Sequence, residues 1–142
     1  MRLIEIEGVS RRSTIHIGER LQHLPRLLPR GPAVIISDSE VLRRYRGELP
    51  PLPVLSIPSG EAAKTLETVQ DLYEALIELE ADRSAFVLGV GGGVVCDVAG
   101  FVASTYLRGV RFGFVATTLL AQVDASVGGK NGVNLGGYKN LV

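Results

Sequence analysis

The stretch AFVLGVGGGVVCD, residues 85–97, decides the fold. Its first six residues are apolar and rich in β-branched side chains, which is typical of a strand buried on both faces. Residues 94–107 then follow a helical pattern, so the glycines lie at a strand-to-helix turn. Because glycine tolerates positive φ and carries no Cβ, Gly91, Gly92 and Gly93 let an anion approach the amide groups of the helix start. The pattern predicts a phosphate-binding turn, with a purely structural turn as the alternative.

The same turn carries a dinucleotide-binding spacing. Gly91-x-Gly93-x-x-Cys96 fits that fingerprint if a small cysteine replaces the third glycine. The acidic residue expected about 20 positions further on is missing, because residues 111–118 contain no carboxylate. A carboxylate that binds a ribose must therefore come from another part of the chain.

The composition limits the class of protein. Fifteen basic and fifteen acidic side chains balance among 142 residues, which argues against nucleic-acid or membrane-surface partners. A single cysteine excludes a disulfide framework and favours the cytoplasm. The apolar stretch 85–107 is rejected as a membrane span because the glycines and Asp97 would lie in the middle of it. A mean hydropathy of +0.25 predicts apolar surface that another domain or a second subunit covers, and we expect a homodimer.

Strands and helices alternate along the chain. Strands are predicted at residues 3–7, 13–17, 33–38, 54–58, 85–90 and 112–116, and helices at residues 19–28, 39–46, 65–80, 94–107 and 117–127. This rhythm predicts a single α/β domain over residues 1–142, with a Rossmann-like, open, mostly parallel sheet and helices on both faces. Ligands of such sheets bind at the carboxyl ends of the strands.

Several charged residues follow those strand ends. Asp38 either accepts hydrogen bonds from a ribose or caps the next helix. Glu61 and Lys64 have the spacing of a local i,i+3 ion pair, which we favour over a ligand role. Asp97 lies one turn inside an apolar helix, and a buried carboxylate needs a hydrogen-bond donor, so we expect a ligand hydroxyl or amide there.

The stretch TTLLAQVDASVGGK, residues 117–130, repeats this arrangement. One of Thr117 and Thr118 is predicted to cap the helix, and Asp124 is a charge among apolar residues. Basic and amide groups on nearby turns indicate an anionic, hydroxylated substrate; these are Arg108, Lys130, Lys139 and Asn140.

No metal site is expected in the chain. His16 and His23 are interpreted as surface or edge residues, and neither is assigned to a metal. Cys96 is interpreted as a small packing residue, because no histidine lies nearby in the sequence to activate it.

These residues resemble a known family. The chain is similar to the N-terminal domain of the 3-dehydroquinate synthases from about Gly60 to its last residue, through several motifs in the family's order and spacing: SGEAAK (59–64), GGGVVCD (91–97), AGF (99–101), STYLRG (104–109), TTLLAQVDASVGGK (117–130) and KNLV (139–142). One position departs from the family pattern, since Cys96 stands where glycine is usual.

The resemblance implies an NAD-dependent lyase of the shikimate route, which converts the sugar acid phosphate DAHP into 3-dehydroquinate and phosphate. It implies that Gly91, Gly92, Gly93 and Val94 hold the pyrophosphate and that Asp97 holds the nicotinamide ribose. The rest of the dinucleotide would contact Asp38, Glu61, Lys64, Thr117 and Thr118. Asp124, Lys130, Lys139 and Asn140 would face the substrate and the nicotinamide, and Arg108 the substrate phosphate, from a neighbouring subunit or its own.

The resemblance also implies a divalent metal, zinc or cobalt, held by one glutamate and two histidines in a following helical domain. That domain is absent from this sequence, so we expect the chain to be inactive alone. Two alternatives stay open: another sugar phosphate cyclase, and a nucleotide-binding module without chemistry. An iron-dependent alcohol or glycerol dehydrogenase would carry a serine after the glycines, where this sequence has Val94.

Overall fold

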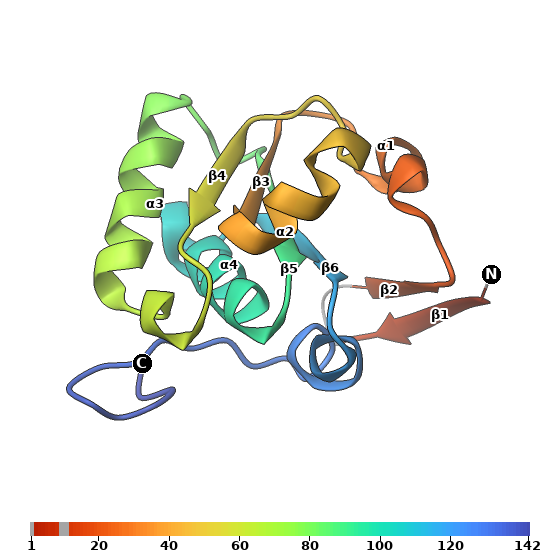
Figure 1. The fold of residues 1–142 in the computed structure, drawn as a ribbon. Coiled ribbons are helices and arrows are strands. Elements are labelled where there is room, and N and C mark those ends of the chain that lie inside the picture. Colours follow the sequence, from red (N-terminus) through yellow and green to blue (C-terminus); the bar gives the residue numbers. More distant parts are fainter. Residues whose placement is uncertain (1, 9–11) are drawn as a thin grey trace.

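A parallel sheet of four strands forms the centre of the molecule (Figure 1). The computed structural model describes residues 2–8 and 12–142. The strands are β3 (Ala33–Asp38), β4 (Val54–Ile57), β5 (Phe86–Gly91) and β6 (Arg111–Ala116), in the spatial order β4-β3-β5-β6. The predicted Rossmann-like architecture is confirmed, and the apolar run before the glycines lies on an inner strand of the sheet.

Helices cover both faces of this sheet, because alternate residues of the inner strands point to opposite sides. On one face, Val34 and Val87 pack with α3 (Leu66–Glu78) and α4 (Gly93–Thr105). On the other face, Ile35 and Leu88 pack with α1 (Leu24–Leu27) and α2 (Ser39–Tyr45). The sheet is therefore buried on both sides, as its continuous apolar strands predict.

Two predicted helices are shorter or less regular than expected. The segment 19–28 forms a 3-10 turn, η1 (Leu21–His23), before the short α1, because Pro25 lacks an amide donor and must sit at a helix start. The helix after the glycines ends at Thr105, and η4 (Tyr106–Arg108) follows with φ values of 50° and 66° at Leu107 and Arg108. These left-handed residues turn the chain back into β6.

The remaining elements are short. The 3-10 turn η2 (Arg46–Glu48) follows α2, and the 3-10 turn η3 (Glu61–Ala63) follows β4. The predicted helix after β6 contains a π-helical stretch, η5 (Ala121–Ala125). The two predicted N-terminal strands, β1 (Arg2–Glu7) and β2 (Arg12–Ile17), are present and form an antiparallel pair that is separate from the main sheet.

The chain ends in a small hairpin, residues 131–142, which we call the C-terminal hairpin. Val133 and Val142 exchange backbone hydrogen bonds, as do Leu135 and Tyr138. Gly136 and Gly137 close the turn with φ values of 59° and 82°, which glycine adopts without strain. The C-terminal segment runs below the carboxyl ends of the strands in Figure 1, so it covers the edge where ligands of such sheets bind.

Candidate nucleotide site

The carboxyl ends of the four parallel strands bring distant residues to one edge of the sheet. Asp38 of β3 is paired with Ile57 of β4, and Gly91 of β5 with Ala116 of β6. Beyond β6, the amide of Thr117 donates to the Gly91 carbonyl over 2.9 Å. The segments after these strands therefore start side by side, as the predicted topology requires.

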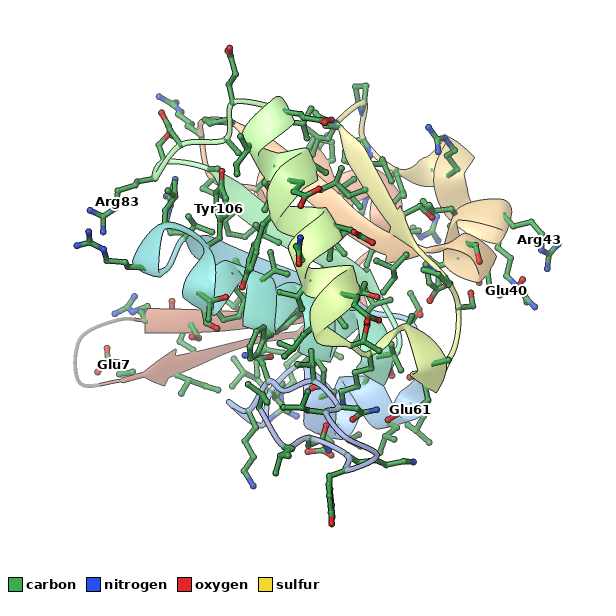
Figure 2. The ribbon with its side chains drawn as sticks, turned by 90° about the vertical axis from the view of Figure 1, so that its left-hand side faces the viewer. Glu7, Glu40, Arg43, Glu61, Arg83 and Tyr106 are labelled. Carbon is green, nitrogen blue, oxygen red and sulfur yellow. The ribbon has the colours of Figure 1, made fainter. Side chains whose placement is uncertain are left out.

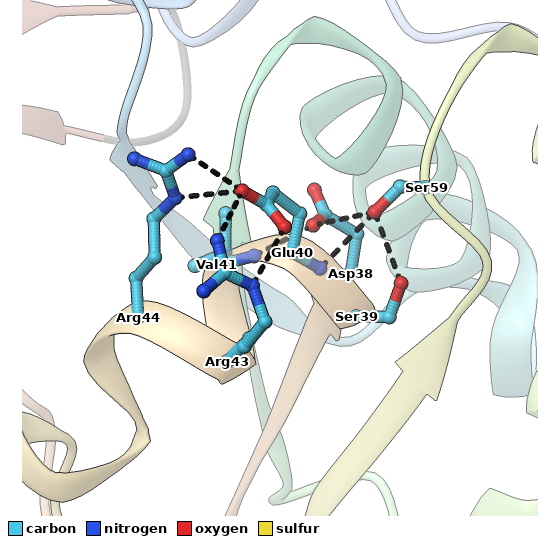
Figure 3. A network of polar contacts seen from close by, with 7 residues as sticks. All are labelled: Asp38, Ser39, Glu40, Val41, Arg43, Arg44 and Ser59. Atoms are coloured by element: carbon cyan, nitrogen blue, oxygen red, sulfur yellow. Dashed lines mark hydrogen bonds and ion pairs between the residues drawn. The ribbon is translucent and has the colours of Figure 1, made fainter.

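Asp38 acts as a helix cap at this edge (Figure 3). Its Oδ1 accepts hydrogen bonds from the Val41 amide at 2.8 Å and from the Ser59 hydroxyl at 3.0 Å. Ser59 in turn accepts from the Glu40 amide at 3.1 Å. Of the two interpretations of Asp38, the cap is confirmed, and the same contacts fix the end of β3 to the loop after β4.

The glycine turn works through close packing rather than through unusual dihedral angles. A Cβ on Gly91 would lie 2.5 Å from the Cβ of Val95, and one on Gly92 would lie 3.1 Å from Cγ2 of Thr118. Gly92 has a φ of −80°, and none of the three glycines has a positive φ. The expectation of positive φ is wrong, because β5 runs in extended conformation into the helix.

The start of α4 has the features of an anion site. Gly92 is its N-cap residue and provides no side-chain cap. The first amide groups of a helix have no partner within it, and the helix dipole places positive charge there. The residues present thus fit a pyrophosphate group, which needs backbone donors at a point that side chains leave open.

Lys64 is the centre of a polar group that we call the Lys64 cluster: Glu61, Lys64, Asp97, Asn134 and Asn140. Its side chain is 5% exposed, and its ammonium group donates to Oδ2 of Asp97 and to Oδ1 of Asn140. The predicted local pair of Glu61 with Lys64 is wrong, because Lys64 turns inward to a carboxylate on α4. Glu61 instead accepts a hydrogen bond from Nδ2 of Asn134 at 2.9 Å.

The burial of Lys64 depends on these partners. An ammonium group removed from water without acceptors is strongly unfavourable. Asp97 supplies the opposite charge and Asn140 a carbonyl, so three segments that are far apart in sequence meet at one cation. The expectation that the Asp97 carboxylate needs a donor is confirmed, but in this structure the donor is a side chain of the same protein.

Two further predictions concern residues beside the glycine turn. Thr118 caps the helix after β6, because its Oγ1 accepts from the Ala121 amide at 3.2 Å. Cys96 is fully buried, and burial together with the negative charge of Asp97 raises the pKa of its thiol to about 11. A thiol with such a pKa is protonated at neutral pH, which agrees with a packing role.

Other predicted site residues are not held in place by the structure. Asp124, Lys130 and Lys139 are exposed, on η5 or on the loops that follow it. Arg108 is also exposed, and it follows α4 at the end opposite the glycine turn. In Figure 2, Tyr106, two residues before Arg108, lies in the upper left of the view and Glu61 in the lower right.

Comparison with known proteins identifies the family. Residues 54–142 match the family model described as 3-dehydroquinate synthase N-terminal. The chain is 44% identical over 140 residues to the 3-dehydroquinate synthase of Natranaerobius thermophilus, covering 90% of this chain and 38% of that protein. The chain belongs to the 3-dehydroquinate synthase family. It spans well under half the length of the first relatives that it matches.

Two solved structures of sugar phosphate cyclases share the fold of this family member. A 2-deoxy-scyllo-inosose synthase complexed with carbaglucose-6-phosphate, NAD+ and Co2+ has a TM-score of 0.85 and 33% identity, covering 99% of this chain and 42% of that one. The 2-epi-5-epi-valiolone synthase of Streptomyces hygroscopicus, with NAD+ and Zn2+ bound, has a TM-score of 0.82 and 31% identity, covering 100% and 42%.

The described residues of this family member do not fit a metal. Within residues 2–8 and 12–142, no group of three histidine, cysteine or acidic side chains is placed to hold an ion. His23 is exposed and pairs with Glu19 at 2.6 Å, and His16 is exposed on β2. Among the described residues, no helix is both long and apolar enough to cross a membrane.

Sequence reasoning missed Asn134 and the role of Gly100. A Cβ on Gly100 would lie 2.0 Å from Oδ1 of Asn131, so the glycine lets the C-terminal hairpin lie against α4. A glycine inside an apolar helix is the one signal that could have indicated this close approach. Nothing in the local sequence around Asn134 indicates its partners, because they lie about 70 residues away or across the hairpin.

Proposed function

We propose that residues 1–142 are the NAD-binding N-terminal domain of a 3-dehydroquinate synthase, which converts DAHP into 3-dehydroquinate and phosphate in the shikimate pathway. The observation that carries this proposal is the uncapped start of α4 after Gly91–Gly92, with Asp97 one turn further along the same helix. Backbone donors followed by a carboxylate provide for a pyrophosphate and then a ribose. The family of the chain supports the assignment.

Each end of the dinucleotide has a candidate contact in this proposal. Asp38 faces the adenosine ribose with the oxygen that the cap leaves free, and Thr117 and Thr118 line the turn beside Gly92. Gly93 and Val94 add amide donors to the pyrophosphate site. Asp97, which Lys64 positions, holds the ribose nearer the nicotinamide, and Glu61 and Lys64 contact the rest of the dinucleotide.

NAD, when bound, would supply a reversible oxidation of a substrate alcohol, accepting a hydride from the carbon that bears the hydroxyl and returning it later. The chain's own residues orient the two reactants. Asp97 accepts hydrogen bonds from ribose hydroxyls, and Lys64 holds that carboxylate in position at the edge of the sheet. Asn140 accepts a hydrogen bond from the same lysine and so holds the C-terminal hairpin next to the nicotinamide end of the site.

The substrate is held by groups that the structure leaves exposed. Asp124, Lys130 and Lys139 are available to an anionic, hydroxylated substrate. Arg108 lies in η4, after the end of α4 that is opposite the glycine turn, so we assign it to the substrate phosphate of a neighbouring subunit in a homodimer. The exposed apolar side chains Leu119, Leu120 and Val123 support a covered surface beside η5.

A divalent metal completes this proposed enzyme, as zinc or cobalt does in the solved cyclases. The described residues contain no group of three histidine, cysteine or acidic side chains placed to hold it. A second candidate function, another sugar phosphate cyclase, is favoured by the fold of the two solved cyclases. The relatives with 40–46% identity over most of the chain are 3-dehydroquinate synthases, and we prefer that substrate.

Calorimetric titration of NAD into the purified chain tests the proposal. Asp97→Asn keeps the shape and removes the charge, and we expect it to weaken NAD by about 1.5–3 kcal/mol, as for a lost charge-assisted hydrogen bond. Gly92→Ala places a Cβ 3.1 Å from Thr118 and beside the amide donors, and should also weaken NAD.

The matched control is Asp71→Asn, which removes an exposed carboxylate on α3. It should leave NAD affinity unchanged. Melting curves of all variants separate binding from folding, because Asp97 also pairs with Lys64. A folded Gly92→Ala protein with unchanged NAD affinity would contradict the proposed pyrophosphate site.

A further inference from the structure

Asn134 joins three parts of the Lys64 cluster through its own backbone and side chain. Its amide nitrogen donates to the carbonyl of Lys64 at 2.9 Å. Its side-chain Nδ2 donates to Oε1 of Glu61, and its Oδ1 accepts from the amide of Asn140, both at 2.9 Å. The side chain thus uses its donor and its acceptor at the same time, toward segments that are 73 and 6 residues away.

The backbone around Asn134 is fixed independently of these side-chain contacts. Asn134 forms a parallel bridge with Thr65, at the start of α3. The preceding Val133 is fully buried in the core that α3 and α4 share. The Asn134 side chain therefore projects from a rigid position rather than from a free loop.

Asn140 needs this support. Its φ is 52°, a left-handed conformation that costs a non-glycine residue free energy. In that conformation its amide meets Asn134 and its side chain meets Lys64. Without the acceptor on Asn134, nothing else in the described contacts holds that amide, and Asn140 is free to release Lys64.

We propose that Asn134 is a positioning residue that fixes Glu61, Lys64 and Asn140 relative to one another and so sets the affinity for the nicotinamide end of NAD. This inference rests on the proposed function, because it takes the Lys64 cluster as the part of the site that holds that end. Asn134 acts through its neighbours and not through a contact with the nucleotide.

The test compares NAD with ADP, which lacks the nicotinamide half, by calorimetric titration into the purified chain. In Asn134→Ala, we expect NAD to bind about tenfold more weakly, as for one lost hydrogen bond, and ADP to bind as it does to the wild type. Gln70→Ala, which removes an exposed amide on α3, serves as the control and should change neither affinity.

The second variant replaces the hydrogen-bond donor of the Asn134 side chain with an acceptor. Asn134→Asp keeps an acceptor for the Asn140 amide but places a carboxylate against Glu61, so NAD should bind more weakly. In the double variant Asn134→Asp with Glu61→Gln, the new amide donates to the new carboxylate, and NAD should bind more tightly than to Asn134→Asp alone.

The outcomes separate the two proposals. An equal loss of NAD and ADP affinity in Asn134→Ala would show a merely structural role and overturn the inference. Unchanged NAD affinity in a folded Asn134→Ala, or no recovery in the double variant, would overturn it too. A wild-type chain that binds neither nucleotide would instead overturn the proposed function, and the role of Asn134 with it.

Discussion

Two charged clusters lie at the same edge of the sheet, and they are built in opposite ways. Glu40 pairs with Arg43 and Arg44, three and four residues further along α2, and all three side chains are about half exposed or more (Figure 3). Lys64 pairs with Asp97 and Asn140, which are 33 and 76 residues away, and its side chain is 5% exposed. The first cluster lies on the surface of one helix, whereas the second connects three segments of the chain.

This difference indicates which charged side chains determine the geometry of a site. Exposed pairs at helical spacing contribute little, because water and salt screen both partners. A buried cation with distant partners fixes the geometry of every segment that supplies one, because losing any partner leaves a charge unsatisfied. We therefore expect substitutions in the Lys64 cluster to affect both stability and binding, and substitutions around Glu40 to affect neither strongly.

The largest effect is expected for Lys64→Met. Methionine keeps a straight, flexible side chain but leaves the partly buried Asp97 carboxylate without its cation. We expect the free energy of unfolding to fall by about 3 kcal/mol, the low end for breaking a buried pair because Asp97 is 21% exposed. Urea unfolding at neutral pH measures it.

The same substitution at Lys130 is the matched control. Lys130 is exposed, so Lys130→Met should change stability by less than about 0.5 kcal/mol. Adding Asp97→Asn to Lys64→Met removes the unpaired charge and should recover part of the loss. Equal losses at the two lysines would mean that burial does not distinguish the clusters.

Much of the fold could be predicted from the sequence. The strand at 33–38 was predicted with the bounds of β3 because it is a continuous apolar run, and the helix at 65–80 contains α3 because its apolar residues recur at helical spacing. Segments with a weaker apolar pattern were predicted less accurately. The segment at 19–28 contains Pro25, whose missing donor confines the α-helix to four residues.

The site was predictable only in part, for a physical reason. Strand ends placed Asp38, Gly92 and Thr117 at one edge, since topology alone decides that. The partners of Lys64 depend on the direction in which its side chain points. The local sequence is compatible with a side chain that points toward Glu61 and equally with one that points toward α4. Sequence spacing favoured a local pair of Lys64 with Glu61, but in the structure the Lys64 side chain is buried and pairs with Asp97.

An intermediate effect is expected for Ser59→Ala. The Ser59 hydroxyl donates to Asp38 and accepts from the Glu40 amide, so it links two strands, but it is exposed. Water can replace both contacts, and we expect a loss of about 0.5–1 kcal/mol in urea unfolding. Ser104→Ala, where the hydroxyl bonds only a carbonyl of its own helix, is the control and should cost less. Equal losses would show that the link between strands adds nothing.

The smallest effect is expected for Glu40→Gln, and it depends on pH. The hydrogen bonds from Arg43 and Arg44 lower the pKa of Glu40 from 4.5 to about 2. A carboxyl whose pKa is lowered by folding stabilises the protein above its unfolded pKa, and this contribution is lost as the pH falls from about 4.5 to 2. Because Glu40 is exposed, we expect only a slight fall in the melting temperature at pH 7, and convergence of the two proteins as the pH approaches about 2. Melting curves across this range, repeated in high salt, measure the difference. A fall as large as that of Lys64→Met would contradict the comparison, because it would give an exposed local pair the weight that we assign to a buried one.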